Sequence, residues 1–179
     1  MDVNAYLVWD EATRLAALFD TGFDAAPIFD LLKQNGLDLR HIFLTHLHHD
    51  HVLALDDVRR QFPGACVHAS AGSFTPMRGS HPGDAVRLGS LSVAVRPTPG
   101  HSPEGASYIV SGWADGVPDV AFVGDALFAG SIGRGMQSWL LARAKVEEQI
   151  LSLPPQTLVG PGHGPWTTVG EELERNPFF

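Results

Sequence analysis

The sequence predicts an α/β fold in which two β-sheets are covered by helices. Short apolar runs alternate along the 179 residues with segments of helical periodicity, and pairs of such runs occur in each half of the chain. Interleaved strands and helices with strand pairs in both halves favour two sheets that each bury a face under helices. The hydrophobic fraction of 44% and the charged fraction of 18% are those of a globular protein. At this length we expect one domain, spanning residues 1–179.

The first third of the chain predicts two strands, a helix, a third strand and a second helix. The apolar runs Tyr6–Trp9 and Leu15–Phe19 are typical of a hairpin. A helix is expected over residues 24–35, where apolar residues recur at helical spacing before a glycine. Residues 42–44 predict a buried strand, and residues 52–62 predict a helix that stops at Pro-Gly.

The rest of the chain predicts mainly strands. They are expected over residues 66–67, 86–88, 91–95, 108–110, 120–123 and 158–160. A helix is expected over residues 138–151, before two prolines, and a shorter helix over 169–175. Residues 71–84 are rich in Gly, Pro and Ser and predict a loop.

The charge balance restricts the partners of the protein. The 12 basic and 20 acidic residues give a formal net charge of −8, whereas nucleic acids and anionic membranes attract proteins with a basic face. No apolar run is long enough to span a bilayer, and no basic leader is visible. The single cysteine, Cys66, rules out an intramolecular disulfide and indicates a reducing compartment. We therefore expect a cytoplasmic protein with a small-molecule partner, and an inert thiol at Cys66 because it lies in an apolar stretch.

The strongest functional signal is the segment Thr45-His46-Leu47-His48-His49-Asp50-His51. In an extended segment, His46 and His48 would point to the same side. Asp50 and His51 follow at once, where the chain must turn into the next helix. Four potential ligands within six residues cannot all easily reach one metal ion, but they can serve two ions a few ångströms apart. Imidazole with carboxylate suits zinc, iron or manganese.

Three further segments share one local pattern, in which a strand end and a glycine precede a potential ligand. They are Pro99-Gly100-His101, Val123-Gly124-Asp125 and Pro161-Gly162-His163. Glycine lets the backbone pass close to a metal or substrate, and loops at strand ends commonly carry catalytic groups. We expect these three residues to join the histidine cluster.

The remaining histidines are weaker candidates. His41, His68 and His81 are isolated, and isolated histidines are more often surface or core residues than ligands. His49 would point away from its neighbours in an extended segment. Asp20, before a Thr-Gly turn, is our candidate carboxylate partner of a ligand histidine, with a turn or cap residue as the alternative.

Four more residues are candidates for contact with substrate. Arg134, Arg143 and Lys145 could meet an anionic group, although each is as compatible with ordinary surface charge. Tyr108 could reach substrate from the strand after His101, with packing within the strand as the alternative.

The segment Thr45-His46-x-His48-x-Asp50-His51 resembles the signature of the metallo-β-lactamase superfamily, and the three downstream ligands follow in that family's order. Within the superfamily, residues 124–134, 161–165 and 170–178 resemble the glyoxalase II-like branch, the hydroxyacylglutathione hydrolases and their small relatives. The resemblance covers nearly the whole chain. It implies a four-layer αββα sandwich of two mixed sheets flanked by helices, with a dinuclear metal site at the edge between the sheets.

The resemblance also implies a role for each ligand. The first ion would be bound by His46, His48 and His101, the second by Asp50, His51 and His163, and Asp125 would bridge them. We expect two divalent ions, zinc first, with iron or manganese as alternatives. Such a pair makes hydroxide available near neutral pH, and the hydroxide would attack the carbonyl carbon of a thioester or ester. Asp50 and Asp125 are the expected catalytic carboxylates, with Asp50 also orienting the water.

Other activities stay open. A persulfide dioxygenase-like oxidoreductase would use one iron at His46, His101 and Asp125, a two-histidine, one-carboxylate set. A lactonase would use the dinuclear site on a cyclic ester, and a metal-stabilised binding module would have a site closed to water. The chain departs from the glyoxalase II branch where Gly135-Met136 follows Gly133-Arg134, and the branch's helical glutathione-binding domain is not expected here. The substrate and the oligomeric state are left open.

Overall fold

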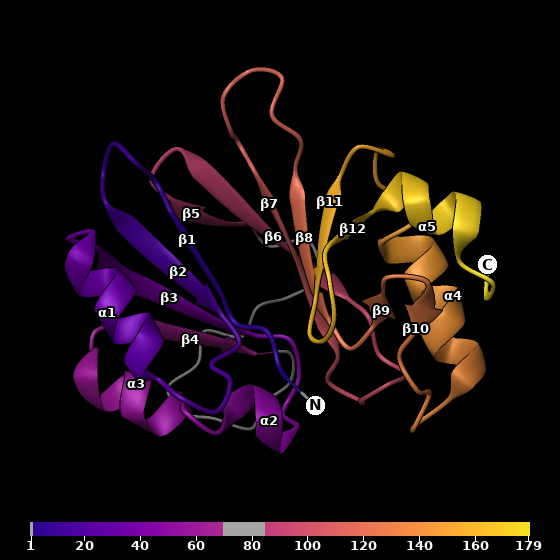
Figure 1. Ribbon diagram of the computed structural model, residues 1–179, viewed down its shortest axis with the longest axis horizontal. Helices are drawn as coiled ribbons and strands as arrows, with labels where there is room; N and C mark the ends of the chain where they lie inside the picture. Colours follow the sequence, from indigo (N-terminus) through magenta and orange to yellow (C-terminus); the bar gives the residue numbers. More distant parts are fainter. Residues whose placement is uncertain (1, 70–84) are drawn as a thin grey trace.

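Two mixed β-sheets lie face to face, and helices cover their outer faces, as Figure 1 shows. The computed structural model describes residues 2–69 and 85–179. This arrangement of two sheets between helices confirms the expected four-layer αββα sandwich. The loop expected over residues 71–84, and His81 within it, lie outside the described residues.

The N-terminal sheet has the order β1-β2-β3-β4. Its strands are β1 (Tyr6–Trp9), β2 (Leu15–Phe19), β3 (Asp38–Leu44) and β4 (Cys66–Ala69). The first two pair antiparallel, as the predicted hairpin requires, and the other neighbours pair parallel. The helices of this half are α1 (Ala26–Gln34), α2 (His49–Val52) and α3 (Leu55–Gln61).

The C-terminal sheet has the order β12-β11-β8-β7-β6-β5. Its strands are β5 (Ala85–Leu88), β6 (Leu91–Pro97), β7 (Ala106–Ser111), β8 (Val120–Gly124), β11 (Leu158–Pro161) and β12 (Thr167–Thr168). A separate hairpin is formed by β9 (Leu127–Phe128) and β10 (Ser131–Ile132), and the helices are α4 (Trp139–Gln149) and α5 (Val169–Arg175). Because β6 and β8 are both antiparallel to β7, and β11 is parallel to β8, the three strands β6, β8 and β11 end at the same edge of the sheet.

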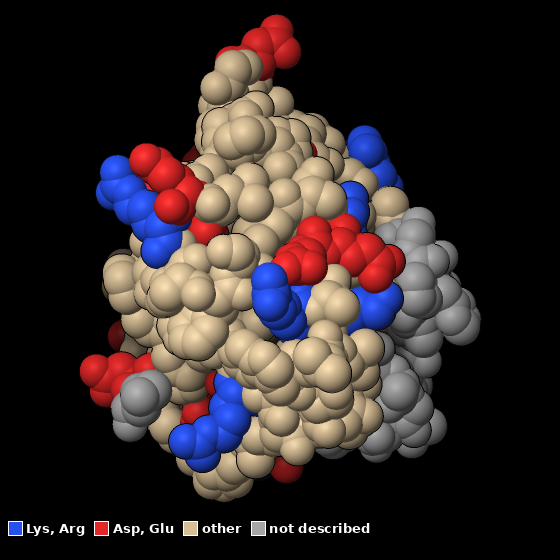
Figure 2. Space-filling model, turned by 90° about the vertical axis from the view of Figure 1, so that its right-hand side faces the viewer, with Lys and Arg blue, Asp and Glu red and all other residues tan. Residues whose placement is uncertain are grey.

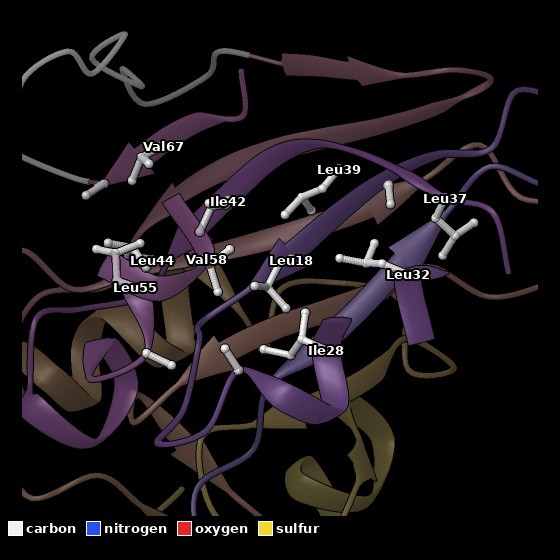
Figure 3. Packing of buried hydrophobic residues seen from close by; sticks show 14 residues of the cluster. Leu18, Ile28, Leu32, Leu37, Leu39, Ile42, Leu44, Leu55, Val58 and Val67 are labelled. Carbon is white, nitrogen blue, oxygen red and sulfur yellow. The ribbon is translucent and has the colours of Figure 1, made fainter. Parts of the chain in front are cut away.

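Period-two alternation along the strands sorts their side chains between layers. Leu18 and Ile42 face outward and pack against Ile28 of α1 and Val58 of α3 (Figure 3). Their strand neighbours Phe19 and Phe43 face inward and join the cluster between the sheets, together with Tyr108 and Phe122 of the C-terminal sheet. The ring centroids of Phe19 and Phe122 lie 4.3 Å apart across this seam. The outer face of the C-terminal sheet packs against α4 and α5.

The structure corrects several expected boundaries. In place of the one helix expected over residues 52–62 there are two, α2 beginning at His49 and α3 at Leu55. Between them, Ala54 donates its N–H to Gly22 O (3.0 Å) and not to a carbonyl of α2. Strand β3 begins at Asp38, earlier than expected. The two-residue strands β9, β10 and β12 were not predicted, since so short a segment carries no readable alternation.

Asp10 joins the turns of the two sheets at the end of the sandwich away from Asp20. It accepts hydrogen bonds from Thr13 N (2.7 Å) in its own hairpin turn and from Ser90 N (2.9 Å) in the β5–β6 turn. The Ser90 hydroxyl also donates to this carboxylate. The hydrogen bonds from Ser90 and Thr13 lower the pKa of Asp10 below its ordinary value.

The surface carries charges of both signs. Figure 2 shows basic and acidic residues interspersed on the face that carries α4 and α5, with no continuous basic area there. On α4, Arg143 pairs with Glu147 (3.1 Å) and Lys145 pairs with Glu148 (2.6 Å). Across residues 2–69 and 85–179, none of the helices has the length and hydrophobicity that a bilayer crossing needs.

Candidate metal centre

The seven expected ligands meet at one edge of the sandwich. His46 and His48 follow β3, and Asp50 and His51 lie in α2. His101, Asp125 and His163 lie in the loops that follow β6, β8 and β11, the three strands that end at this edge. The fold thus brings together donor residues that are far apart in the sequence, as expected.

The first group of donors consists of His46, His48 and His101. His48 Nδ1 lies 3.0 Å from His46 Nε2 and 3.1 Å from His101 Nε2. The His101 Nε2 atom is also 3.5 Å from Asp125 Oδ2. Three imidazole nitrogens and one carboxylate oxygen therefore surround one point.

The second group consists of Asp50, His51 and His163. Asp50 Oδ2 lies 3.2 Å from His163 Nε2 and 3.9 Å from His51 Nε2. The other oxygen of Asp125, Oδ1, is 3.3 Å from His51 Nε2 and 3.6 Å from His163 Nε2. One carboxylate thus presents one oxygen to each group.

The donors fit divalent cations in spacing and in chemistry. Within the described residues, the buried atoms His51 Nε2 and Asp125 Oδ1 lie 3.3 Å apart, yet neither makes a hydrogen bond, and a buried polar atom without one costs about 1–3 kcal/mol. Metal–nitrogen bonds of about 2.0–2.1 Å in a tetrahedron separate neighbouring donors by about 3.3 Å. The separations of 3.0–3.6 Å among most of these atoms bracket that value.

In four of the five histidines of these groups, the ring nitrogen that faces away is held by a protein oxygen. Their Nδ1 contacts are His46 with Thr45 Oγ1 (3.1 Å), His51 with Asp20 Oδ2 (2.8 Å), His101 with Arg134 O (2.8 Å) and His163 with Asp2 O (2.6 Å). A carbonyl oxygen only accepts, so the Nδ1 atoms of His101 and His163 donate. Their Nε2 lone pairs are then free for a cation, which is the usual arrangement around metal-binding histidines.

Asp20 is the carboxylate partner that the sequence suggested. It is 3% exposed and adopts a positive φ of 54°. Besides His51 Nδ1, it accepts from Thr45 N (2.8 Å) and from Thr45 Oγ1 (2.7 Å). Because the Thr45 hydroxyl donates to Asp20, it accepts from His46 Nδ1, so Asp20 orients one histidine of each group.

Burial and neighbouring charges shift the pKa values of the two buried histidines, His46 and His51, in opposite directions. Burial, helped by the charge of His51, lowers the pKa of His46 to about 2, so His46 is neutral. Burial also opposes a charge on His51, but Asp125 and Asp20 outweigh it and raise the pKa of His51 to about 10. The pKa of Asp125 is lowered, because His51 outweighs the opposing effect of burial. His51 must lose its proton before Nε2 can bind a cation.

The other histidines lie outside the donor groups. His41 Nδ1 and His68 Nε2 form a hydrogen bond of 3.0 Å between β3 and β4, and burial lowers the pKa of His41. His49 is exposed at the start of α2. Cys66 is half-buried on β4.

The suggested substrate contact of Tyr108 is wrong. Its side chain is fully buried between the sheets, and its hydroxyl donates to Leu44 O (2.7 Å). The side chain of Arg134 is exposed, but the contact that Arg134 makes with the centre is through its backbone carbonyl to His101.

Three more residues shape the centre, and the glycine-before-ligand pattern pointed only to Gly162 among them. Gly162 has no room for a side chain, because a Cβ would meet Asp125 Oδ1 and lie 2.6 Å from His51 Cε1. Thr45 stands beside His46 in the motif, and its hydroxyl could have been suspected on that ground. The carbonyl of Asp2 carries no signal in the sequence.

A family model described as the metallo-beta-lactamase superfamily matches residues 1–174. The chain is 34% identical over 205 residues to "Probable metallo-hydrolase YqgX" of Bacillus subtilis, covering 100% of this chain and 93% of that protein. It is 28% identical over 204 residues to "Hydroxyacylglutathione hydrolase GloC" of Haemophilus influenzae (98% and 92%). It is 30% identical over 182 residues to human "Persulfide dioxygenase ETHE1, mitochondrial" (96% and 69%).

Solved structures share the fold closely. The crystal structure of BLEG-1 B3 metallo-beta-lactamase superposes with a TM-score of 0.85 at 33% identity, covering 98% of this chain and 93% of that one. The crystal structure of TTHA1623 in a di-iron-bound form superposes with a TM-score of 0.81 at 31% identity (99% and 95%).

Proposed function

The chain belongs to the metallo-beta-lactamase superfamily, and we propose that it is a metal-dependent hydrolase that cleaves a small-molecule thioester or a related ester at a dinuclear centre. One observation carries the proposal: two groups of three donors share the carboxylate of Asp125. A single ion would leave one of the groups unused. Zinc is the proposed metal, with iron or manganese as alternatives.

Two divalent ions, when bound, would lower the pKa of a water between them to about 7 and polarise the substrate carbonyl. The residues supply the setting for this chemistry. Asp125 fixes the spacing of the two groups, and Asp20 holds the buried histidines in orientation. The side chain of Asp50 is 34% exposed, against 11% for Asp125 and 12% for His163. We assign Asp50 to orient the attacking water and accept its proton, because it faces solvent more than the other carboxylate.

The thioester substrate is supported by similarity to GloC, a hydroxyacylglutathione hydrolase that this chain matches over 98% of its length. At 28% identity, this similarity supports the class of substrate and not glutathione itself. We further propose that residues 1–179 work as one domain in the cytoplasm. The centre draws on both sheets, and the chain has a single cysteine.

A second candidate is a persulfide dioxygenase with one iron at His46, His101 and Asp125. Similarity to ETHE1 favours it, and that donor set is the one that non-haem iron oxygenases use. Against it stands the completeness of the second group, in which Asp50, His51 and His163 converge on one point.

Metal analysis with a substrate panel tests the proposal. We expect about two ions per chain and hydrolysis of S-lactoylglutathione or another thioester. One iron per chain, with oxygen uptake on glutathione persulfide, would establish the second candidate instead. Two ions with turnover of lactones alone would make the protein a lactonase, and metal-dependent folding without any turnover would make it a binding module.

A further inference from the structure

The segment before β1 lies against the loop that carries His163. Asn4 donates its backbone N–H to Gly162 O (2.8 Å), and its side-chain Nδ2 donates to Pro161 O (3.0 Å) and to Gly164 O (2.9 Å). Figure 1 shows the indigo segment before β1 on the side of the sandwich that also carries α2. One asparagine thus binds three carbonyls of a four-residue loop.

The same segment also contacts the histidine itself. His163 Nδ1 donates to the carbonyl of Asp2 (2.6 Å), two residues before Asn4. This hydrogen bond leaves the Nε2 lone pair of His163 facing Asp50 (3.2 Å) and Asp125 (3.6 Å). The position of the Asp2 carbonyl depends on how Asn4 is held.

We propose that Asn4 is a positioning residue for the second donor group, which fixes the loop of residues 161–164 and brings the Asp2 carbonyl to His163. The inference rests on the proposed dinuclear centre. Nothing in the sequence singles out Asn4, since it stands between Val3 and Ala5 before the first strand and belongs to no motif.

The effect of Asn4 is selective for one group. In the first group, the outward ring nitrogens of His46 and His101 are held by Thr45 and by Arg134. Neither of these contacts involves the segment before β1. Removal of the Asn4 side chain therefore weakens the second ion and leaves the first in place.

The test is a zinc titration of metal-free protein by calorimetry, comparing wild type with Asn4→Ala and Asn4→Asp. The aspartate keeps the shape but replaces two donors by a carboxylate that faces carbonyl oxygens. We expect two binding events in wild type, with one event weakened by about 10–100-fold in both variants and the other unchanged, as for other residues that support metal ligands. Asn35→Ala is the matched control, because Asn35 Nδ2 donates to Leu31 O (2.9 Å) on the surface of α1.

A second measurement follows the His163 Nδ1–H signal by NMR in metal-free protein. It should be shifted or lost in Asn4→Ala and Asn4→Asp, and unchanged in Asn35→Ala. Equal weakening of both ions, or no weakening, overturns the inference, and so does an unchanged His163 signal. A wild-type protein that binds one ion contradicts the dinuclear centre instead, while the NMR comparison still decides whether Asn4 positions His163.

Discussion

The two halves of the molecule supply the donor atoms of the two groups in different ways. The N-terminal half delivers four donors from the six consecutive residues 46–51, whereas the C-terminal half delivers three donors from three separate strand ends. In the first case local geometry suffices, because one turn from β3 into α2 sets the spacing. In the second case the spacing depends on the pairing of β6, β8 and β11 and on glycines that let the loops approach. The contiguous donors should therefore respond to changes nearby, and the scattered donors to changes in backbone contacts.

Gly162→Ala should have the largest effect and tests the scattered half. The added methyl group would overlap Asp125 Oδ1 and crowd His51, which displaces donors of the second group. We expect loss of one ion and a fall in hydrolysis of about 100-fold, the cost of a small misplacement in an active site. Zinc content and turnover measure it.

Gly64→Ala is the control for that change, since a Cβ at Gly64 meets nothing within 4 Å. It should retain both ions. Full zinc content in Gly162→Ala would show that the close approach of this loop is not needed.

Asp20→Asn tests the contiguous half and should rank second. Asp20 contacts His51 directly and His46 through Thr45, so both ions should bind about 10–100-fold more weakly. Asn4→Ala, in contrast, should weaken only one. Zinc titration distinguishes the two patterns, with exposed Asp30→Asn as the control. Selective loss of one ion in Asp20→Asn would contradict the shared role.

Glu172→Gln tests whether hydrogen bonds away from the centre stabilise the C-terminal half, which carries the scattered donors. The buried Glu172 carboxylate accepts from Gly130 N (3.0 Å), Thr167 Oγ1 (2.6 Å) and Asn176 Nδ2 (2.7 Å), which joins α5 to the β9–β10 hairpin after Asp125. The side-chain NH2 group of glutamine is itself a donor and cannot accept these hydrogen bonds. We therefore expect the variant to lose about 1–3 kcal/mol of unfolding free energy. Chemical denaturation measures it, and exposed Glu174→Gln should be neutral.

Asp10→Asn should have the smallest effect, because Asp10 lies at the opposite end of the sandwich. Its pKa is lowered in the folded protein, so its charge stabilises the fold above the ordinary carboxyl pKa of 3.8, and this stabilisation is lost as the pH falls. The melting temperature of the variant should be lower near neutral pH, and the difference from wild type should shrink below about pH 4. Zinc affinity should not change. A changed affinity would mean that the two ends are coupled.

The contiguous half was largely predictable from sequence. The donors of the segment 46–51 could be read from residue types and spacing, and Asp20 was the candidate partner of a ligand histidine; that this histidine is His51 comes from the structure. The convergence of His101, Asp125 and His163 was expected from their shared Gly-ligand pattern, and the structure brings them together. Their roles as metal ligands remain predictions.

What could not be predicted depends on long-range backbone contacts. The break between α2 and α3 coincides with a hydrogen bond of Ala54 to Gly22, which lies on another element. The burial of Tyr108 follows from the packing of two sheets. Asn4 acts across 157 residues on Pro161, and no local pattern can reveal such a contact.

The placement of the centre across the seam between the sheets has a consequence for the whole fold. Each donor group takes members from both halves, so every ion would fasten one sheet to the other. Binding that requires the assembled seam adds to the unfolding free energy, by about 2.7 kcal/mol when the free ion is at 100 times its dissociation constant. The supply of metal around the protein would then set how much heat or denaturant it withstands, whether or not any substrate is present.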